Sequence, residues 1–202
     1  YVYSLRETGK VVANCHKLPA SLFDRRRVGV DEMIRGWIPL IERLSDSNPE
    51  LRIMFTVSPI RHLRDGAHEN QLSKSVLLLF VDELCRMYPD RCIYFPSYEI
   101  VMDELRDYRF YDAGMTHPNE QAIRYIWERF SEACFSEETQ TLNREWERLE
   151  KALNHRPLTP DKDAFRDFTM QNLFKLKKIW EKYSYFDLSK EIDSLELFLK
   201  TL

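Results

Sequence analysis

Apolar residues recur along the chain with two different periods, and these periods predict alternating helices and strands. Positions 31–44 and 72–87 carry apolar residues three and four positions apart, which is typical of amphipathic helices. Residues 52–57 and 92–95 are instead short apolar runs that follow a helix, as expected of buried parallel strands. A further apolar stripe predicts a helix that begins at Pro118. This alternation predicts an α/β protein with a parallel sheet.

The pattern changes at both ends of the chain. Residues 1–14 read as a β-hairpin with a Thr-Gly turn, whereas residues 23–30 read as a loop that carries three consecutive arginines. Asp31 is expected to cap the next helix, and Pro39 to lie inside that helix and kink it. After residue 135 the apolar stripes predict three more helices. We therefore expect an α/β domain over 1–135 and a helical extension over 136–202 that packs on the same domain.

Composition narrows the possible partners. The 202 residues are 44% hydrophobic and 31% charged with a net charge of -3, so neither a nucleic acid nor an anionic membrane is expected as a partner. No apolar run approaches ~18 residues, the length of a membrane-spanning helix. Four cysteines lack metal-ligand spacing and read as reduced thiols, which favours a cytoplasmic location. Neither a metal nor a cofactor is expected.

The first residue is Tyr1 rather than methionine, and it opens directly into strand-like alternation. We expect that the natural chain begins earlier. Without that earlier segment the chain would expose apolar surface, and it would then aggregate or pair with a second copy as a homo-oligomer.

His117 is the first candidate for chemistry. It precedes Pro118 and stands three residues before Glu120, so the spacing places it at or beside a helix N-cap with Glu120 as capping-box partner. The positive end of a helix disfavours imidazolium, and a neutral imidazole is what a general base requires. The alternative is a histidine that only caps the helix.

Polar side chains follow the 52–57 strand and form a second group of candidates. Ligands bind beyond the carboxyl ends of parallel strands, and the planar fork of an arginine can bind a carboxylate or phosphate. The same side chains could instead satisfy the backbone groups of their own loop. The predicted substrate-binding residues are Ser58, Arg61, His62 and Asn70. Elsewhere, the neighbouring Cys15 and His16 cannot form a dyad on an extended chain, so we expect a loop there.

Three segments together resemble the GSCFA family of bacterial proteins. They are VSPIRHLRDGAHENQLSK at 57–74, YFPSYEIVMDELRDYRFYDAGMTHP at 94–118 and HRP at 155–157, and VVANCHKLP at 11–19 also fits. The resemblance covers nearly the whole chain. It implies the SGNH-hydrolase superfamily, and therefore a flavodoxin-like three-layer α/β/α sandwich with a parallel sheet and C-terminal helices. It also implies an esterase that acts on acyl esters, with acylated carbohydrate as a candidate substrate.

The resemblance also assigns catalytic residues. His117 matches the histidine of the superfamily's Asp-x-x-His block, but Gly114 stands where the aspartate is expected, and we expect Asp112 to substitute for it. The nucleophile, a serine or cysteine, would lie upstream of Tyr1, because the family's Gly-Ser-Cys-Phe-Ala motif is not in this sequence. An acyltransferase would use the same residues. A non-catalytic binding or interaction protein on the same fold is the alternative.

Overall fold

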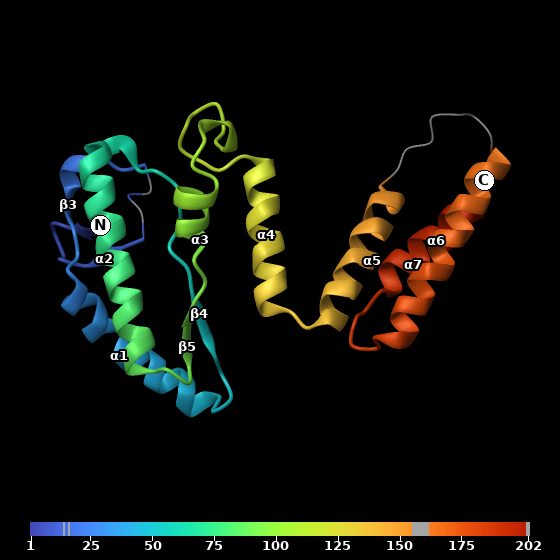
Figure 1. Ribbon diagram of the computed structural model, residues 1–202, viewed down its shortest axis with the longest axis horizontal. Coiled ribbons are helices and arrows are strands. Elements are labelled where there is room, and N and C mark those ends of the chain that lie inside the picture. The colour runs from blue at the N-terminus through green and yellow to red at the C-terminus, as the bar shows by residue number, and fades with distance from the viewer. Residues whose placement is uncertain (14, 16, 155–161, 201–202) are drawn as a thin grey trace. The chain divides into compact units, whose positions relative to one another are not determined.

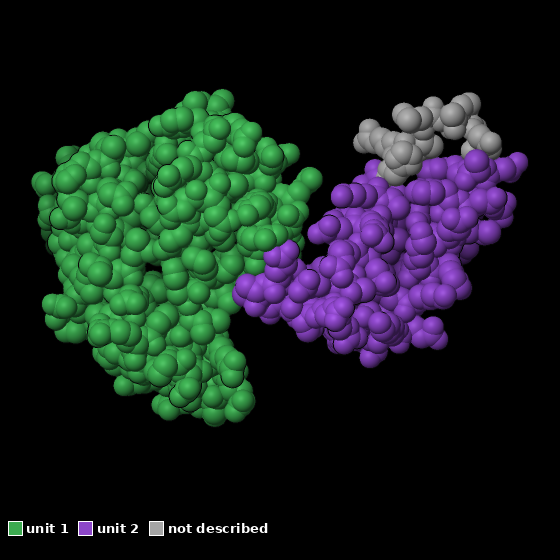
Figure 2. Space-filling model, in the orientation of Figure 1, with its two compact units in different colours: residues 1–130 green, residues 131–202 purple. Residues whose placement is uncertain are grey.

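The computed structural model describes residues 1–13, 15, 17–154 and 162–200, which fall into two units (Figure 1). The first unit is Tyr1–Phe130 and the second is Ser131–Leu202 (Figure 2). The packing of the C-terminal helices on the α/β domain stays a prediction. The sequence features at His16 and at 155–157 lie outside the described residues.

The first unit contains two small sheets among its described residues. Its elements are β1 (Val2–Leu5), β2 (Val11–Val12), β3 (Phe23–Arg26), α1 (Val30–Ser47), β4 (Ile53–Phe55), η2 (Leu63–Asp65), α2 (Gly66–Met87), β5 (Cys92–Tyr94), α3 (Ser97–Glu99), η3 (Ile100–Glu104), η4 (Tyr108–Phe110) and α4 (Glu120–Cys134), with the short turn η1 (Ala20–Leu22) before β3. The first sheet is antiparallel with the strand order β2-β1-β3. The second is the parallel pair of β4 and β5.

The predicted N-terminal hairpin is confirmed, because β1 pairs with β2 and places Tyr3 opposite Val12. The loop predicted over 23–30 is wrong in its first half. Phe23 is buried and lies opposite Leu5, so residues Phe23–Arg26 pair with the other edge of β1 as β3. The strand was missed because it carries charged residues at three of its four positions, which removes the apolar alternation of a half-buried strand.

The parallel strands predicted from the apolar runs are confirmed, and helices cover both faces of β4. Side chains alternate between the faces of a strand. Ile53 and Phe55 of β4 pack in the cluster built around Leu84, which lies on α2. Met54 packs instead in the cluster that contains Ala122 of α4. The fold is therefore mixed α/β with a small parallel sheet (Figure 1).

Helix α1 begins at Val30, so its N-cap lies two residues before the predicted one. Gly29 is its N-cap and contributes no side-chain hydrogen bond, so Asp31 lies in the first turn and does not cap the helix. An acidic residue in that turn still interacts favourably with the helix dipole. Pro39 lies inside α1, as predicted.

The second unit contains the three helices predicted after residue 135: α5 (Glu137–Leu153), α6 (Lys162–Lys182) and α7 (Ser189–Leu199). The Ser136 hydroxyl caps α5 by accepting a hydrogen bond from the Thr139 N–H at 3.2 Å. The buried apolar residues of this unit form one cluster: Leu142, Leu149, Leu176, Ile179, Tyr183, Leu188 and Ile192. Across the described part of the chain, no helix is both long enough and apolar enough to cross a membrane.

Candidate functional site

The segment after β4 is fixed by its own polar groups. Val57 is buried, and the Ser58 hydroxyl accepts a hydrogen bond from the Ile60 N–H at 3.2 Å. The Ser58 carbonyl accepts a second hydrogen bond, 2.5 Å long, from the Lys74 ammonium. The Ser58 hydroxyl therefore stabilises the turn in which it lies, as expected if this side chain satisfies the backbone groups of its own loop.

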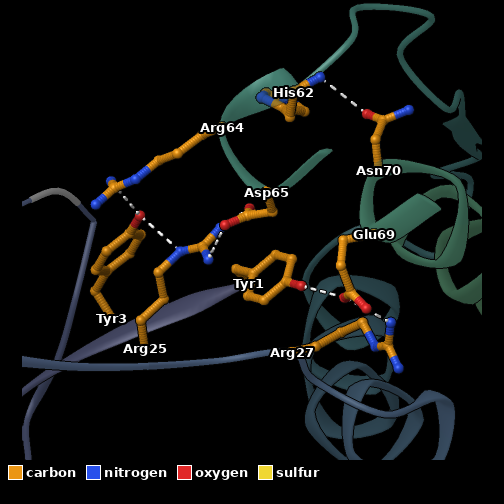
Figure 3. A network of polar contacts seen from close by, with 9 residues as sticks. All are labelled: Tyr1, Tyr3, Arg25, Arg27, His62, Arg64, Asp65, Glu69 and Asn70. Atoms are coloured by element: carbon orange, nitrogen blue, oxygen red, sulfur yellow. Dashed lines mark hydrogen bonds and ion pairs between the residues drawn. The ribbon is translucent and has the colours of Figure 1, made fainter. Parts of the chain in front are cut away.

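Asn70 connects the same segment to the first turns of α2. Its side-chain oxygen accepts a hydrogen bond from the His62 N–H at 2.9 Å, as Figure 3 shows. Both residues line a cavity of about 330 Å³ at the surface of the first unit. The other residues that line this cavity are Tyr1, Tyr3, Arg25, Arg64, Asp65, Ser73, Lys74 and Leu77. Of the four predicted substrate-binding residues, His62 and Asn70 thus share a cavity that Ser58 and Arg61 do not line.

His117 and Asp112 lie together in one tight loop, as predicted. The Asp112 N–H donates to the His117 carbonyl at 2.8 Å, and the Asp112 Oδ1 accepts from the N–H groups of Thr116 and His117 at 3.3 and 3.4 Å. The Asp112 Oδ2 lies 3.6 Å from the His117 Nδ1. Both side chains reach solvent, with exposures of 58% for His117 and 44% for Asp112.

Gly114 lies next to the carboxylate of Asp112 in this loop. A Cβ atom built on Gly114 would lie 3.4 Å from the Asp112 Oδ1 and 3.6 Å from the Thr116 hydroxyl. The carboxylate of Asp112 therefore lies directly beside position 114, where the Asp-x-x-His pattern would have its aspartate. The gap of 3.6 Å between the Asp112 Oδ2 and the His117 Nδ1 is longer than a hydrogen bond, and the role of Asp112 as the substitute for that aspartate stays a prediction.

A second group also contacts the imidazole. The Thr116 hydroxyl lies 2.9 Å from the His117 Nδ1, closer than the carboxylate of Asp112. Thr116 was not among the residues singled out from the sequence, because a hydroxyl next to a histidine in the chain carries no spacing signal. Among the described residues, no hydrogen-bond partner lies at Nε2, so that nitrogen faces away from the groups that hold the ring.

The prediction that His117 lies at the N-cap is wrong. Helix α4 begins at Glu120, and the Asn119 side-chain oxygen caps it by accepting a hydrogen bond from the Ala122 N–H at 3.1 Å. Pro118 pairs with Tyr111 in an isolated antiparallel bridge, so it belongs to an extended segment before the helix. The argument from the helix dipole therefore does not apply to His117.

The two candidate segments are joined by the backbone. The Arg61 N–H donates a hydrogen bond to the Thr116 carbonyl at 3.0 Å. The Arg61 guanidinium lies over the ring of Tyr111, 4.3 Å from its centroid, and that residue directly precedes Asp112. Arg61 is thus the one predicted substrate-binding residue whose side chain is placed beside the His117 loop.

The three consecutive arginines are paired with carboxylates of the chain. Arg25 binds both carboxylate oxygens of Asp65 at 2.7 and 2.5 Å, and Arg27 binds Glu69 at 3.1 Å (Figure 3). Arg26 binds Glu32. Each guanidinium therefore has a carboxylate of the chain as its partner, and the Arg25–Asp65 pair connects β3 to the turn η2 next to the cavity.

The Arg25–Asp65 pair predicts a pH-dependent contribution to stability. Hydrogen bonds from Arg25 favour the charged carboxylate and lower the pKa of Asp65 below its ordinary value of 3.8. A lowered pKa gives stability that is complete above the ordinary value and is lost as the pH falls through the lowered one.

We expect Asp65→Asn to lower the urea midpoint at neutral pH, and this difference from the wild type to shrink as the pH falls below about 3.8. Asp103→Asn is the matched control, because its partner Arg106 is largely exposed and the pair should contribute little. A difference for Asp65→Asn that stayed constant down to the acid transition would contradict this assignment.

Lys74 is the residue of this region that the sequence did not reveal. Its side chain lies at the edge of the cavity and is only 3% exposed, and burial lowers the pKa of its ammonium. The signal was weak, because a lysine in an amphipathic helix is normally read as exposed. Its position seven residues before the buried Val81 would have placed it on the inward face.

The structure is that of a mixed α/β protein in which a loop that carries a histidine and an aspartate lies beside the end of a parallel strand. The sequence profile described as the GSCFA family matches residues 1–130. A second profile, described as the C-terminal domain of GSCFA domain proteins, matches residues 146–201. The chain therefore belongs to the GSCFA family. Neither the curated proteins nor the solved structures that were searched gave a match.

Proposed function

We propose that this GSCFA-family chain carries the acid–base part of an ester hydrolase that acts on acyl esters, with acylated carbohydrate as the substrate class. In this proposal the first unit belongs to a flavodoxin-like three-layer sandwich of the SGNH-hydrolase kind. The observation that carries the proposal is the His117 loop, in which the Asp112 carboxylate lies 3.6 Å from Nδ1 while Nε2 is left open.

The open nitrogen defines the proposed chemistry. A serine or cysteine from outside the described residues gives its proton to the His117 Nε2 and bonds to the acyl carbon. The carbon–oxygen bond to the alcohol then breaks, and the alcohol leaves with the proton from the imidazolium. Water gives a proton to Nε2, attacks the acyl carbon and releases the acid, while the nucleophile recovers its proton. Asp112 stabilises the imidazolium in both steps.

Substrate binding is assigned to the segments that join at the Arg61–Thr116 hydrogen bond. The Arg61 guanidinium, held over Tyr111, can bind an anionic group of the substrate next to His117. His62 and Asn70 bind the more distant part of the substrate in their shared cavity. Ser58 shapes the turn between these two places. Transfer of the acyl group to a second alcohol would use the same intermediate.

One observation favours a binding protein as the second candidate. The Thr116 hydroxyl is the nearer group to Nδ1, at 2.9 Å against 3.6 Å for Asp112. A hydroxyl fixes the ring but does not neutralise an imidazolium, so a histidine held this way suits hydrogen bonding to a ligand better than proton transfer. The hydrolase depends on the Asp112 carboxylate, whereas the binding protein depends on the Thr116 hydroxyl.

Substitution of each neighbour separates the two candidates. We expect Asp112→Asn to lower kcat/KM of the full-length protein for p-nitrophenyl acetate by roughly 10²-fold or more, because an amide cannot stabilise the imidazolium. Thr116→Val should retain most of the activity. Asp103→Asn, an exposed aspartate in an ion pair with Arg106, is the control and should leave the rate unchanged.

The absence of any turnover above the uncatalysed rate would favour the binding protein. Turnover that depends on Thr116 but not on Asp112 would overturn the assignment of the carboxylate.

A further inference from the structure

The second unit has a cavity of its own between α5 and α6, remote in sequence from the His117 loop. Its volume is about 350 Å³, which lies at the lower end of the range for small-molecule sites. Its lining residues are Glu145, Arg148 and Leu149 of α5 and Asn172, Lys175, Lys178 and Ile179 of α6. On each helix these positions recur at the spacing of one helical face, so the two faces line a cavity that is partly open to solvent.

Asn172 is the residue of this cavity that most needs a partner. The residue is only 3% exposed, and within the described part of the chain no hydrogen bond to its side-chain amide is found, so the amide is accessible only through the cavity that it lines. The neighbouring buried Thr169 shows the contrast, because its hydroxyl donates to the Phe165 carbonyl at 2.8 Å. Buried polar groups are nearly always hydrogen-bonded, and an unpaired one that lines a cavity indicates a partner from outside the chain.

The charges around the cavity indicate the sign of that partner. Arg148, Lys175 and Lys178 line it with a single carboxylate, that of Glu145. Among the described residues none of the three cations forms an ion pair, and the Lys178 ammonium lies instead 4.6 Å from the ring centroid of Phe174. On the same helix but outside the cavity, Lys177 is paired with Glu196 at 2.5 Å. The lining therefore carries a net excess of two positive charges, on side chains that also reach solvent.

We propose that this cavity binds a small phosphomonoester. The excess of two positive charges matches a phosphate dianion, and the fork of Arg148 suits its oxygens. Lys175 completes the contact with the phosphate, and the Asn172 amide hydrogen-bonds to the ester oxygen or to a neighbouring hydroxyl. The organic part of the ligand lies against Leu149 and Ile179, which are buried apolar residues of the lining. This binding function is independent of ester hydrolysis in the first unit.

Calorimetric titration of the full chain with phenyl phosphate tests the proposal. We expect one saturable site, weakened roughly tenfold or more in Arg148→Gln and in Lys175→Gln. Lys177→Gln is the matched control, because it removes a lysine of the same helix whose partner is Glu196, and its affinity should equal that of the wild type. Benzoate, which carries a single charge, should bind at least tenfold more weakly than phenyl phosphate.

Asn172→Leu supplies a readout that does not depend on the charges. It removes the unpaired amide, so we expect a higher melting temperature for the free protein together with loss of phenyl phosphate binding. No saturable heat up to about 10 mM phenyl phosphate would overturn the proposal. An equal loss of affinity in Lys177→Gln, or equally tight binding of benzoate, would also overturn it.

Discussion

Replacement of His117 by alanine is expected to lower kcat/KM for an aryl acetate by roughly 10²- to 10⁴-fold, the range found for loss of a positioned general base. The imidazole is held at Nδ1 by Thr116 and faces the carboxylate of Asp112, so its other nitrogen is the one that can accept a proton. Alanine removes that acceptor but leaves the loop intact, because the loop is held by backbone groups and by the Asp112 carboxylate.

The loss should appear in kcat rather than in KM, because His117 acts on the proton of the nucleophile and not on the bound ester. The Asp103→Asn variant again controls for nonspecific effects of a surface substitution. Unfolding midpoints of His117→Ala and the wild type should agree, since the side chain is more than half exposed. An undiminished rate would remove His117 from the catalytic site.

Leu84→Ala is expected to have the largest effect on stability, a loss of about 2–5 kcal/mol in the free energy of unfolding. Leu84 is 0% exposed at the centre of the cluster that packs α1 and α2 on the parallel strands. The truncated side chain leaves a cavity between elements that cannot close up easily. The substitution should also disturb the candidate site, because the same helix α2 carries Asn70 and Lys74.

Leu79→Ala is the matched control for this substitution. Leu79 lies on the same helix and has the same side chain, but it is 61% exposed. Its truncation should change stability by less than about 0.5 kcal/mol, as for most surface substitutions. Chemical denaturation of both variants by circular dichroism measures the difference. Equal losses would contradict the packing of α2 described above.

The parts of the fold that could be predicted are those in which burial decides the residue types. Strand β4 is covered on both faces and β5 packs Cys92 and Tyr94 against the core, so their apolar runs stand out from the surrounding polar sequence. Strand β3 could not be predicted, because its arginines are neutralised by carboxylates from distant segments. Such ion pairs produce no alternation of apolar and polar residues in the sequence of the strand itself.

The candidate site was predictable only within one loop. Asp112 and His117 are five residues apart, and a short loop with Gly114 between them can bring them together. The start of α4 was predicted too early, because Pro118 and Glu120 have the spacing of a capping sequence that begins at His117. The side chain of Asn119 makes the actual cap. The approach of Arg61 to Thr116 depends on the tertiary structure, which no local pattern records.

The most direct test of the proposed hydrolase is the first turnover of p-nitrophenyl acetate by the full-length protein. The proposed mechanism predicts a rapid burst of about one nitrophenol per protein molecule, because the acyl group first moves to the nucleophile and is then hydrolysed. The burst should disappear in His117→Ala. Nitrophenol release that is no faster than in buffer, or a burst of the same rate in His117→Ala, would contradict the account.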